Sequence, residues 1–337
     1  MIYPWQYNDW NNLQKLRARW PNVLLIFGQV GIGKLSFAKY LAQSFLCEVP
    51  KLNGQPCNHC LSCIWFEHGN HFDYRIMIPE ALLSNTVIRV NDVKDDGKKK
   101  STLSKEIKID QVRMILDFCR VTSHRGGVRV IVIYPAETMN VIASNAMLKI
   151  LEEPPKDVIF ILVSVQINRL LPTIISRCQK WPMQTPLMDI ASIWLSEQGI
   201  DDARALLTQA GGSPFSALAL ANDKNQKLRD FVLGQLAKGA ACDPFTCAEN
   251  LQNLPIPLVL SWLQRWLYDL LTQRMTKTLR YFPKYAIEIT RCANEIDKNK
   301  LSSFVRTVTR QRAIENHPLN SRLMFDEMFF NYRNLFI

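Results

Sequence analysis

Residues 22–46 constrain the fold of this chain more than any other segment. The run begins with the apolar stretch "NVLLIF", which is typical of a buried strand, and continues into "GQVGIGKL". The residues after this loop place apolar side chains at helical spacing. A strand, a glycine-rich loop and a helix in this order predict a phosphate-binding loop, where backbone N–H groups and a helix N-terminus face an anion.

The loop departs from the usual phosphate-loop pattern at one position. The pattern G-x-x-x-x-G-K-[ST] is met by Gly28, Gly33 and Lys34, with Gly31 between the two outer glycines. Leu35 then stands where a hydroxyl normally ligates the magnesium ion of a bound nucleotide. We therefore predict a degenerate loop that hydrolyses no ATP, and the sequence leaves open whether ATP binds there through Lys34.

Three further apolar segments, interleaved with helical patterns, predict a parallel α/β domain. The predicted strands are residues 73–79, 128–134 and 157–165, and the predicted helices between them are residues 109–122 and 140–151. From about Cys178 onward the strand pattern fades and helical spacing takes over. We predict an α/β domain at residues 1–180, a small helical domain at 181–222 and a larger helical domain at 223–337.

The second element of a magnesium site is also missing from its expected place. That element is an acidic residue at the end of a strand next to the phosphate loop, and the strand at 128–134 ends in Tyr134 and Pro135 instead. Glu137 follows shortly after and is the available substitute, although the proline between strand and carboxylate disturbs the usual geometry.

Four of the nine cysteines lie close together in the sequence, within residues 47–63. Their spacing is Cys47-x9-Cys57-x2-Cys60-x2-Cys63, and short x2 spacings let one tight turn present several thiolates. We predict a structural zinc site inserted in the α/β domain. A set of buried or redox cysteines is the plainer alternative. A nucleic-acid-binding zinc ribbon is disfavoured because residues 54–63 carry no lysine or arginine.

The composition narrows the class of protein but indicates no mechanism. The formal net charge is +11, which suits work near nucleic acid or acidic partner subunits. No apolar run reaches the roughly 18 residues that span a bilayer, and the N-terminus does not follow the pattern of a secretory signal. We expect a cytoplasmic protein. The lysine-rich stretch at residues 91–108 also carries acidic residues, which favours a solvated loop over a DNA-binding segment.

Residues 145–178 carry a more specific signal, "NAMLKILEEPPKDVIFILVS" followed by "ISRC". This run resembles bacterial clamp-loader subunits of the AAA+ superfamily, whose motif is N-A-L-L-K-x-L-E-E-P-P, then a strand and S-R-C. Met147 replaces one leucine of that motif. Residues 3–5 and the cysteine cluster are also similar to this family, and within it to subunits that lack a working ATPase site. The stretch Gly212-Ser213-Pro214-Phe215 has no arginine where ATP-hydrolysing members carry a sensor arginine.

The resemblance implies a RecA-like AAA+ domain with a zinc knuckle, a lid domain and a helical collar domain. It also implies a hetero-oligomeric clamp loader of the DNA polymerase III holoenzyme, with the ATPase subunits gamma and tau and the delta subunit as partners. The sliding clamp and primed DNA would be reached through that assembly. In this family the arginine of S-R-C, here Arg177, acts in trans as an arginine finger on ATP held by a neighbouring subunit.

Two other functions remain possible on the sequence alone. One is an active AAA+ ATPase that uses Lys34 with atypical magnesium ligation through Glu137. The other is a zinc-dependent nucleic-acid-binding module, whose affinity for DNA would depend steeply on salt.

Overall fold

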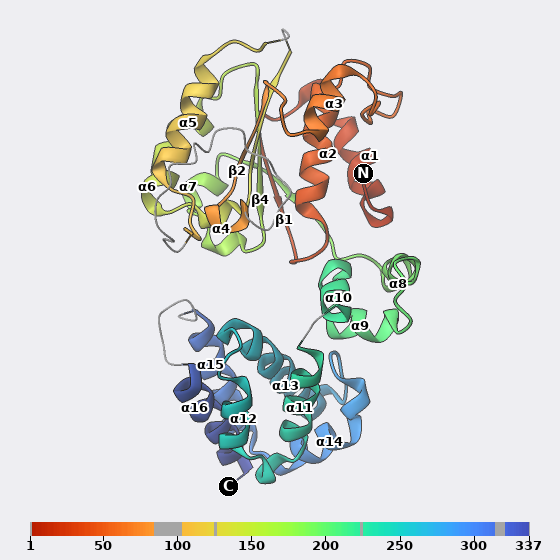
Figure 1. Ribbon diagram of the computed structural model, residues 1–337, viewed down its shortest axis with the longest axis vertical. Coiled ribbons are helices and arrows are strands. Elements are labelled where there is room, and N and C mark those ends of the chain that lie inside the picture. Colours follow the sequence, from red (N-terminus) through yellow and green to blue (C-terminus); the bar gives the residue numbers. More distant parts are fainter. Residues whose placement is uncertain (1, 84–102, 125–126, 223–224, 314–320, 337) are drawn as a thin grey trace. The chain divides into compact units, whose positions relative to one another are not determined.

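The computed structural model describes residues 2–83, 103–124, 127–222, 225–313 and 321–336 (Figure 1). Most of the lysine-rich stretch at 91–108 therefore lies outside the described residues. The chain divides into two compact units, Met1–Ile190 and Ala191–Ile337. The three-domain division with boundaries at residues 180 and 222 stays a prediction.

The first unit is built on a parallel sheet of five strands in the order β2-β3-β4-β1-β5. Every residue of β3 and β4 is buried, which agrees with their continuous apolar sequences. The predicted parallel α/β architecture is confirmed. The strands are β1 (Val23–Phe27), β2 (Tyr74–Met77), β3 (Arg129–Ile133), β4 (Val158–Ser164) and β5 (Gln179–Pro182).

The β5 strand, which was not predicted from the sequence, pairs in parallel with β1 at one edge of the sheet. Its sequence, "QKWP", shows no apolar alternation, carries a proline and leaves most of its side chains exposed. Proline is tolerated at a sheet edge because no second ladder needs its N–H. Such a short polar edge strand gives no periodic signal, and only the pairing with β1 reveals it.

Helices cover both faces of the sheet (Figure 1). Successive strand residues point to opposite faces, so Leu25 and Phe160 join one core while Leu24 and Ile161 join the other. The first core lies against α5 (Ile109–Arg120), α6 (Val141–Glu152) and α7 (Pro172–Ile175). The second core lies against α1 (Tyr7–Lys15) and α2 (Lys34–Leu46). Two short helices, α3 (Leu61–Glu67) and α4 (Glu80–Leu83), also belong to this unit.

The described residues of the second unit form helices and no strand. Trp262 and Trp266 are fully buried in its core, so both belong to the helical core rather than to an exposed contact surface. Within the described residues, no helix is both long and apolar enough to cross a bilayer. The helices are α8 (Met188–Glu197), α9 (Ala203–Gln209), α10 (Pro214–Ala221), α11 (Gln226–Ala237), α12 (Pro244–Leu251), α13 (Ile256–Thr276), α14 (Ala286–Glu295), α15 (Lys298–Ala313) and α16 (Ser321–Arg333).

Candidate functional site

The glycine loop connects β1 to α2, as the sequence predicts. Gly31 and Gly33 have φ of 75° and 85°, a left-handed conformation that glycine adopts without strain. Gly28 is required for a second reason, since a Cβ there would lie 2.4 Å from the carbonyl oxygen of Met183. The sequence therefore keeps the backbone of a phosphate loop although the hydroxyl position has changed.

Lys34 does not reach out of this loop. Its side chain is buried, and its ammonium group donates hydrogen bonds to the carbonyl oxygens of Gly28, at 2.8 Å, and of Gln29. Burial lowers the pKa of Lys34 to about 8, because the charged form loses hydration, and the nearby Glu137 carboxylate offsets part of that effect. The group that would bind phosphate is thus engaged with the loop itself.

The two residues at the magnesium-ligating positions, Leu35 and Glu137, make other contacts in this structure. Leu35 packs against the core on the α2 face of the sheet. Glu137 lies in a turn after β3, and its Oε1 accepts hydrogen bonds from the backbone N–H groups of Val165, at 3.0 Å, and Gln166, at 3.1 Å. Its Oε2 is buried without a hydrogen-bond partner. One oxygen of Glu137 therefore caps the backbone that leaves β4.

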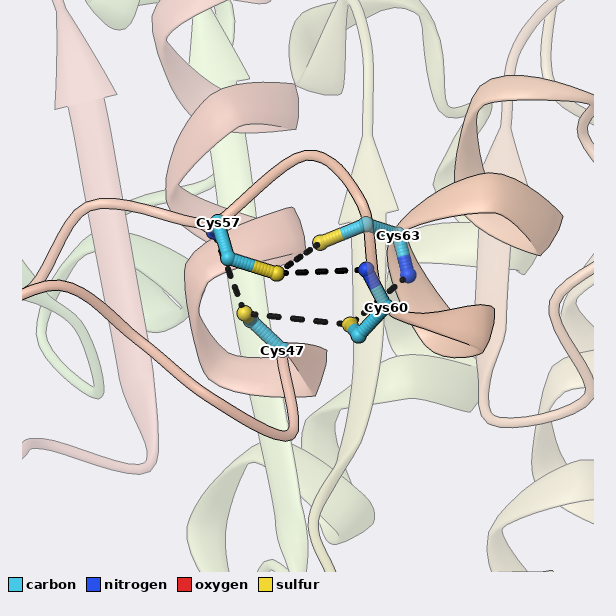
Figure 2. Close-up of side chains that lie close together, drawn as sticks. All are labelled: Cys47, Cys57, Cys60 and Cys63. Atoms are coloured by element: carbon cyan, nitrogen blue, oxygen red, sulfur yellow. Dashed lines mark hydrogen bonds between the residues drawn. The ribbon is translucent and has the colours of Figure 1, made fainter.

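The four cysteines of residues 47–63 converge in the structure (Figure 2). Cys47 follows the end of α2, Cys57 and Cys60 lie in the turn before α3, and Cys63 lies in the first turn of α3. All four sulfur atoms lie within 4.8 Å of one another. The Cys47–Cys60 and Cys57–Cys63 sulfur distances are both 4.0 Å.

This donor set fits a tetrahedral metal. A zinc ion with Zn–S bonds of about 2.3 Å places its four sulfurs roughly 3.8 Å apart, close to the observed distances. Backbone N–H groups of Cys57, Cys60 and Cys63 donate to the sulfurs of Cys47, Cys57 and Cys60 at 3.3, 3.3 and 3.4 Å, which favours thiolates. Backbone N–H donors, first that of His59, lower the pKa of Cys57 to about 6. The cluster could therefore hold a metal ion.

The nearby histidines do not add to this ligand set. His71 is buried, and its Nδ1 accepts the N–H of Asp73 at 3.1 Å, so the proton of the neutral ring is on Nε2. Nε2 then donates to Ser62 Oγ at 2.6 Å, and Ser62 Oγ donates to the carbonyl of Leu46. His71 thus ties α3 to the end of α2, beside Cys47. Desolvation by burial lowers its pKa and favours this neutral form.

Arg17 supports the same cluster and was missed in the sequence. Its guanidinium donates to the carbonyls of Ser44, at 2.8 Å, and Gly54, at 3.0 Å, so it links the end of α2 to the loop between Cys47 and Cys57. Burial lowers the pKa of Arg17, and the charge of Cys47 opposes that shift. A positive group beside a cluster of thiolates offsets part of their mutual repulsion.

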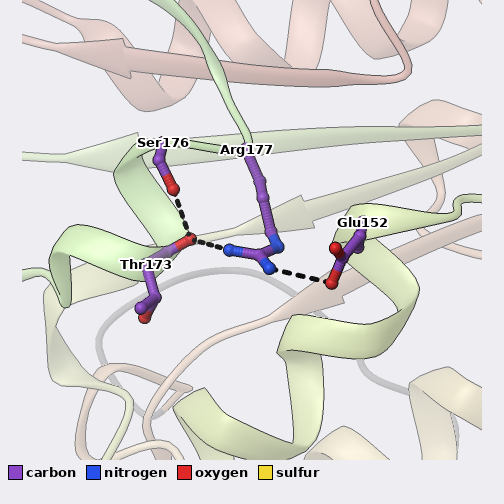
Figure 3. Close-up of polar contacts among 4 residues, drawn as sticks. All are labelled: Glu152, Thr173, Ser176 and Arg177. Atoms are coloured by element: carbon purple, nitrogen blue, oxygen red, sulfur yellow. Dashed lines mark hydrogen bonds and ion pairs between the residues drawn. The ribbon is translucent and has the colours of Figure 1, made fainter.

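Arg177 forms a separate site with Thr173 and Glu152 (Figure 3). Its Nη1 donates to the carbonyl oxygen of Thr173 at 3.0 Å, and its Nη2 pairs with Glu152 Oε2 at 2.8 Å. The Arg177 side chain is 28% exposed. Cys178, the last residue of S-R-C, is buried, and burial raises its pKa to about 12. It belongs to the core on this face of the sheet, and its thiol donates to Ile174 O at 3.1 Å.

The structure places Arg177 far from the glycine loop. The loop follows the C-terminal end of β1, whereas Arg177 precedes the N-terminal end of β5, and the two strands are parallel neighbours. The loop and Arg177 therefore lie at opposite ends of these two neighbouring strands. The residues of β5 alone separate the two ends by roughly 13 Å, at about 3.3 Å per residue. Arg177 cannot serve the loop of its own chain.

Residues 6–186 match the family described as "DNA polymerase III, delta subunit". The chain is 33% identical to DNA polymerase III subunit delta' of Pseudomonas aeruginosa, over 82% of this chain and 79% of that protein. It is 30% identical to the Escherichia coli subunit of the same name, over 80% of this chain and 76% of that one. A solved Thermotoga maritima protein related to the DNA polymerase III gamma subunit aligns with a TM-score of 0.44 and 17% identity, over 97% of this chain and 99% of that chain.

Proposed function

The chain belongs to the delta' family of bacterial DNA polymerase III subunits, and from this premise we propose that it is a clamp-loader subunit without ATPase activity of its own. It would act in the cytoplasm, within a hetero-oligomer of gamma or tau and delta subunits. That assembly would open the sliding clamp and place it on primed DNA. The cysteine cluster would hold a structural zinc ion, closed by four thiolates and so not catalytic.

Three features of the glycine loop support the absence of hydrolysis. Leu35 offers no oxygen to magnesium, Lys34 donates to the carbonyls of its own loop, and Glu137 caps the backbone after β4. Phosphoryl transfer depends on placing positive charge and a metal ion around the γ-phosphate. A loop without these groups keeps the backbone conformation of a nucleotide site but lacks the groups that ATP hydrolysis needs.

The position of Arg177 carries the proposal for its role. It lies at the end of the strands opposite the loop of its own chain, so a nucleotide phosphate that it contacts would be held by another subunit. A guanidinium supplied in trans stabilises the charge that develops on the transferred phosphoryl group, and such arginine fingers are worth roughly 10³–10⁵ in rate. We therefore assign Arg177 as the finger offered to ATP on an adjacent ATPase subunit.

The direct test is an assembly reconstituted from the gamma or tau ATPase subunits, the delta subunit and this chain, carrying either Arg177 or Arg177→Ala. We expect the variant to silence the one ATPase site that faces this chain while the other sites continue, and clamp loading onto primed DNA to fall with it. Arg169→Ala is a matched control, because Arg169 is an exposed arginine of the same unit. Equal ATPase rates and clamp loading for the Arg177→Ala and Arg169→Ala assemblies would refute the proposed role.

A further inference from the structure

Glu152 forms an ion pair with Arg177, a residue 25 positions further along the chain. We propose that Glu152 is a positioning residue, which fixes the guanidinium of Arg177 before it meets the nucleotide of a neighbouring subunit. The contact is an ion pair of 2.8 Å between Glu152 Oε2 and Arg177 Nη2 (Figure 3). This inference rests on the proposed role of Arg177 and concerns how this chain orients the Arg177 guanidinium.

The place of Glu152 in its helix argues against a merely local purpose. Glu152 is the last residue of α6, and a carboxylate at the C-terminal end of a helix is disfavoured by the helix dipole. Its side chain is 58% exposed, so it adds little to the core. The carboxylate therefore gains no stability from its own helix, and its ion pair is with the arginine that precedes β5.

The geometry around Arg177 is that of a side chain held in one orientation. Glu152 accepts from Nη2 and the carbonyl of Thr173 accepts from Nη1, so two acceptors from α6 and α7 hold the planar guanidinium. A free arginine loses considerable rotamer entropy when it is fixed on a phosphate. Because these two contacts have already restricted the side chain, less of that entropy remains to be lost when the phosphate is met.

The pair also leaves the arginine free to act. An ion pair with an exposed partner contributes little to the free energy of folding, so the contact orients Arg177 without locking it. Loss of Glu152 should for the same reason leave the chain folded. The effect of removing Glu152 should therefore appear in turnover rather than in stability or in ATP binding.

The test compares Glu152→Gln with Glu153→Gln in the reconstituted assembly. Both residues are exposed, adjacent glutamates, so the two variants change charge equally and differ in whether they pair with Arg177. We expect Glu152→Gln to lower kcat at the site facing this chain by about three- to tenfold, with little change in KM for ATP. Glu153→Gln should match the wild type.

A double variant separates this inference from the proposed function. In an Arg177→Ala background, Glu152→Gln should have no further effect, because both changes remove the same contribution. If Arg177→Ala lowers turnover while Glu152→Gln leaves it unchanged or raises it, Glu152 does not position the finger and only this inference falls. If Arg177→Ala itself has no effect, the proposed function falls first and this inference falls with it.

Discussion

Lys34 donates a 2.8 Å hydrogen bond from its ammonium group to the carbonyl oxygen of Gly28, the first glycine of its own loop. A second bond to the carbonyl of Gln29 leaves the ammonium engaged with the backbone that would otherwise surround a phosphate. A nucleotide would have to replace both bonds and bring a magnesium ion to a loop with Leu35 in the hydroxyl position. The Lys34 ammonium therefore holds the loop together through its own backbone carbonyls.

We expect the purified chain to release no phosphate from ATP in the presence of magnesium. Its rate should be indistinguishable from that of the Lys34→Ala variant. The reason is the loss of both metal-ligating positions, since phosphoryl transfer requires charge placement by these groups. A phosphate-release assay on the chain alone measures this rate. If the wild type hydrolyses ATP and Lys34→Ala abolishes that activity, the chain is instead an active ATPase in which Glu137 ligates magnesium.

The Lys34 ammonium should titrate near pH 8, well below its ordinary value of 10.5, because burial disfavours its charged form. Between these values the unfolded chain binds more protons at this side chain than the folded chain does. Lys34 therefore makes the free energy of unfolding rise with pH across that window. NMR titration of the lysine Cε resonances, with Lys34→Met to assign the signal, tests this value. A Lys34 signal that moves only above pH 10 would contradict this lowered pKa.

The cysteine cluster should bind one zinc ion per chain and stabilise the first unit. We expect Cys57→Ser/Cys60→Ser to lose the metal and to destabilise that unit by at least about 3 kcal/mol, a fraction of the roughly 10–16 kcal/mol with which zinc-finger peptides bind zinc. Metal content by mass spectrometry and thermal unfolding with and without a chelator measure both effects. Cys242→Ser, which alters a buried cysteine of the second unit, should keep the metal. A wild-type chain purified without zinc, and indifferent to it, would count against the assignment.

The sequence predicts best where the interacting residues are near one another in the chain. The glycines of the loop and the four cysteines lie within short segments, so their spacing already carries the geometry of the turn that they form. The continuous apolar runs of β3 and β4 identify buried strands for the same reason. The predicted buried strands are confirmed, and the four cysteines converge as their spacing predicts.

Contacts between distant segments could not be predicted in this way. Arg17 reaches Gly54, and Arg177 reaches Glu152, only because the sheet and its helices bring those segments together. No periodic pattern in the sequence encodes such a pair. The β5 strand was missed for a related reason, since it is defined by its ladder with β1 and not by its own short sequence.

Tyr332 links three helices of the second unit, and its hydroxyl should contribute measurably to stability. Its Oη accepts the indole N–H of Trp266 at 3.0 Å and donates to the carbonyl of Leu236 at 2.8 Å, with Tyr332 and Trp266 both fully buried. Tyr332→Phe keeps the ring and removes both bonds, which leaves the indole N–H unsatisfied and costs about 2 kcal/mol. We expect the thermal midpoint of the second unit to fall by roughly 4–8 °C. Tyr268→Phe, at a half-exposed position in α13, is the control and should shift it little. An unchanged midpoint for Tyr332→Phe would mean that the hydroxyl adds nothing to the packing of α11, α13 and α16.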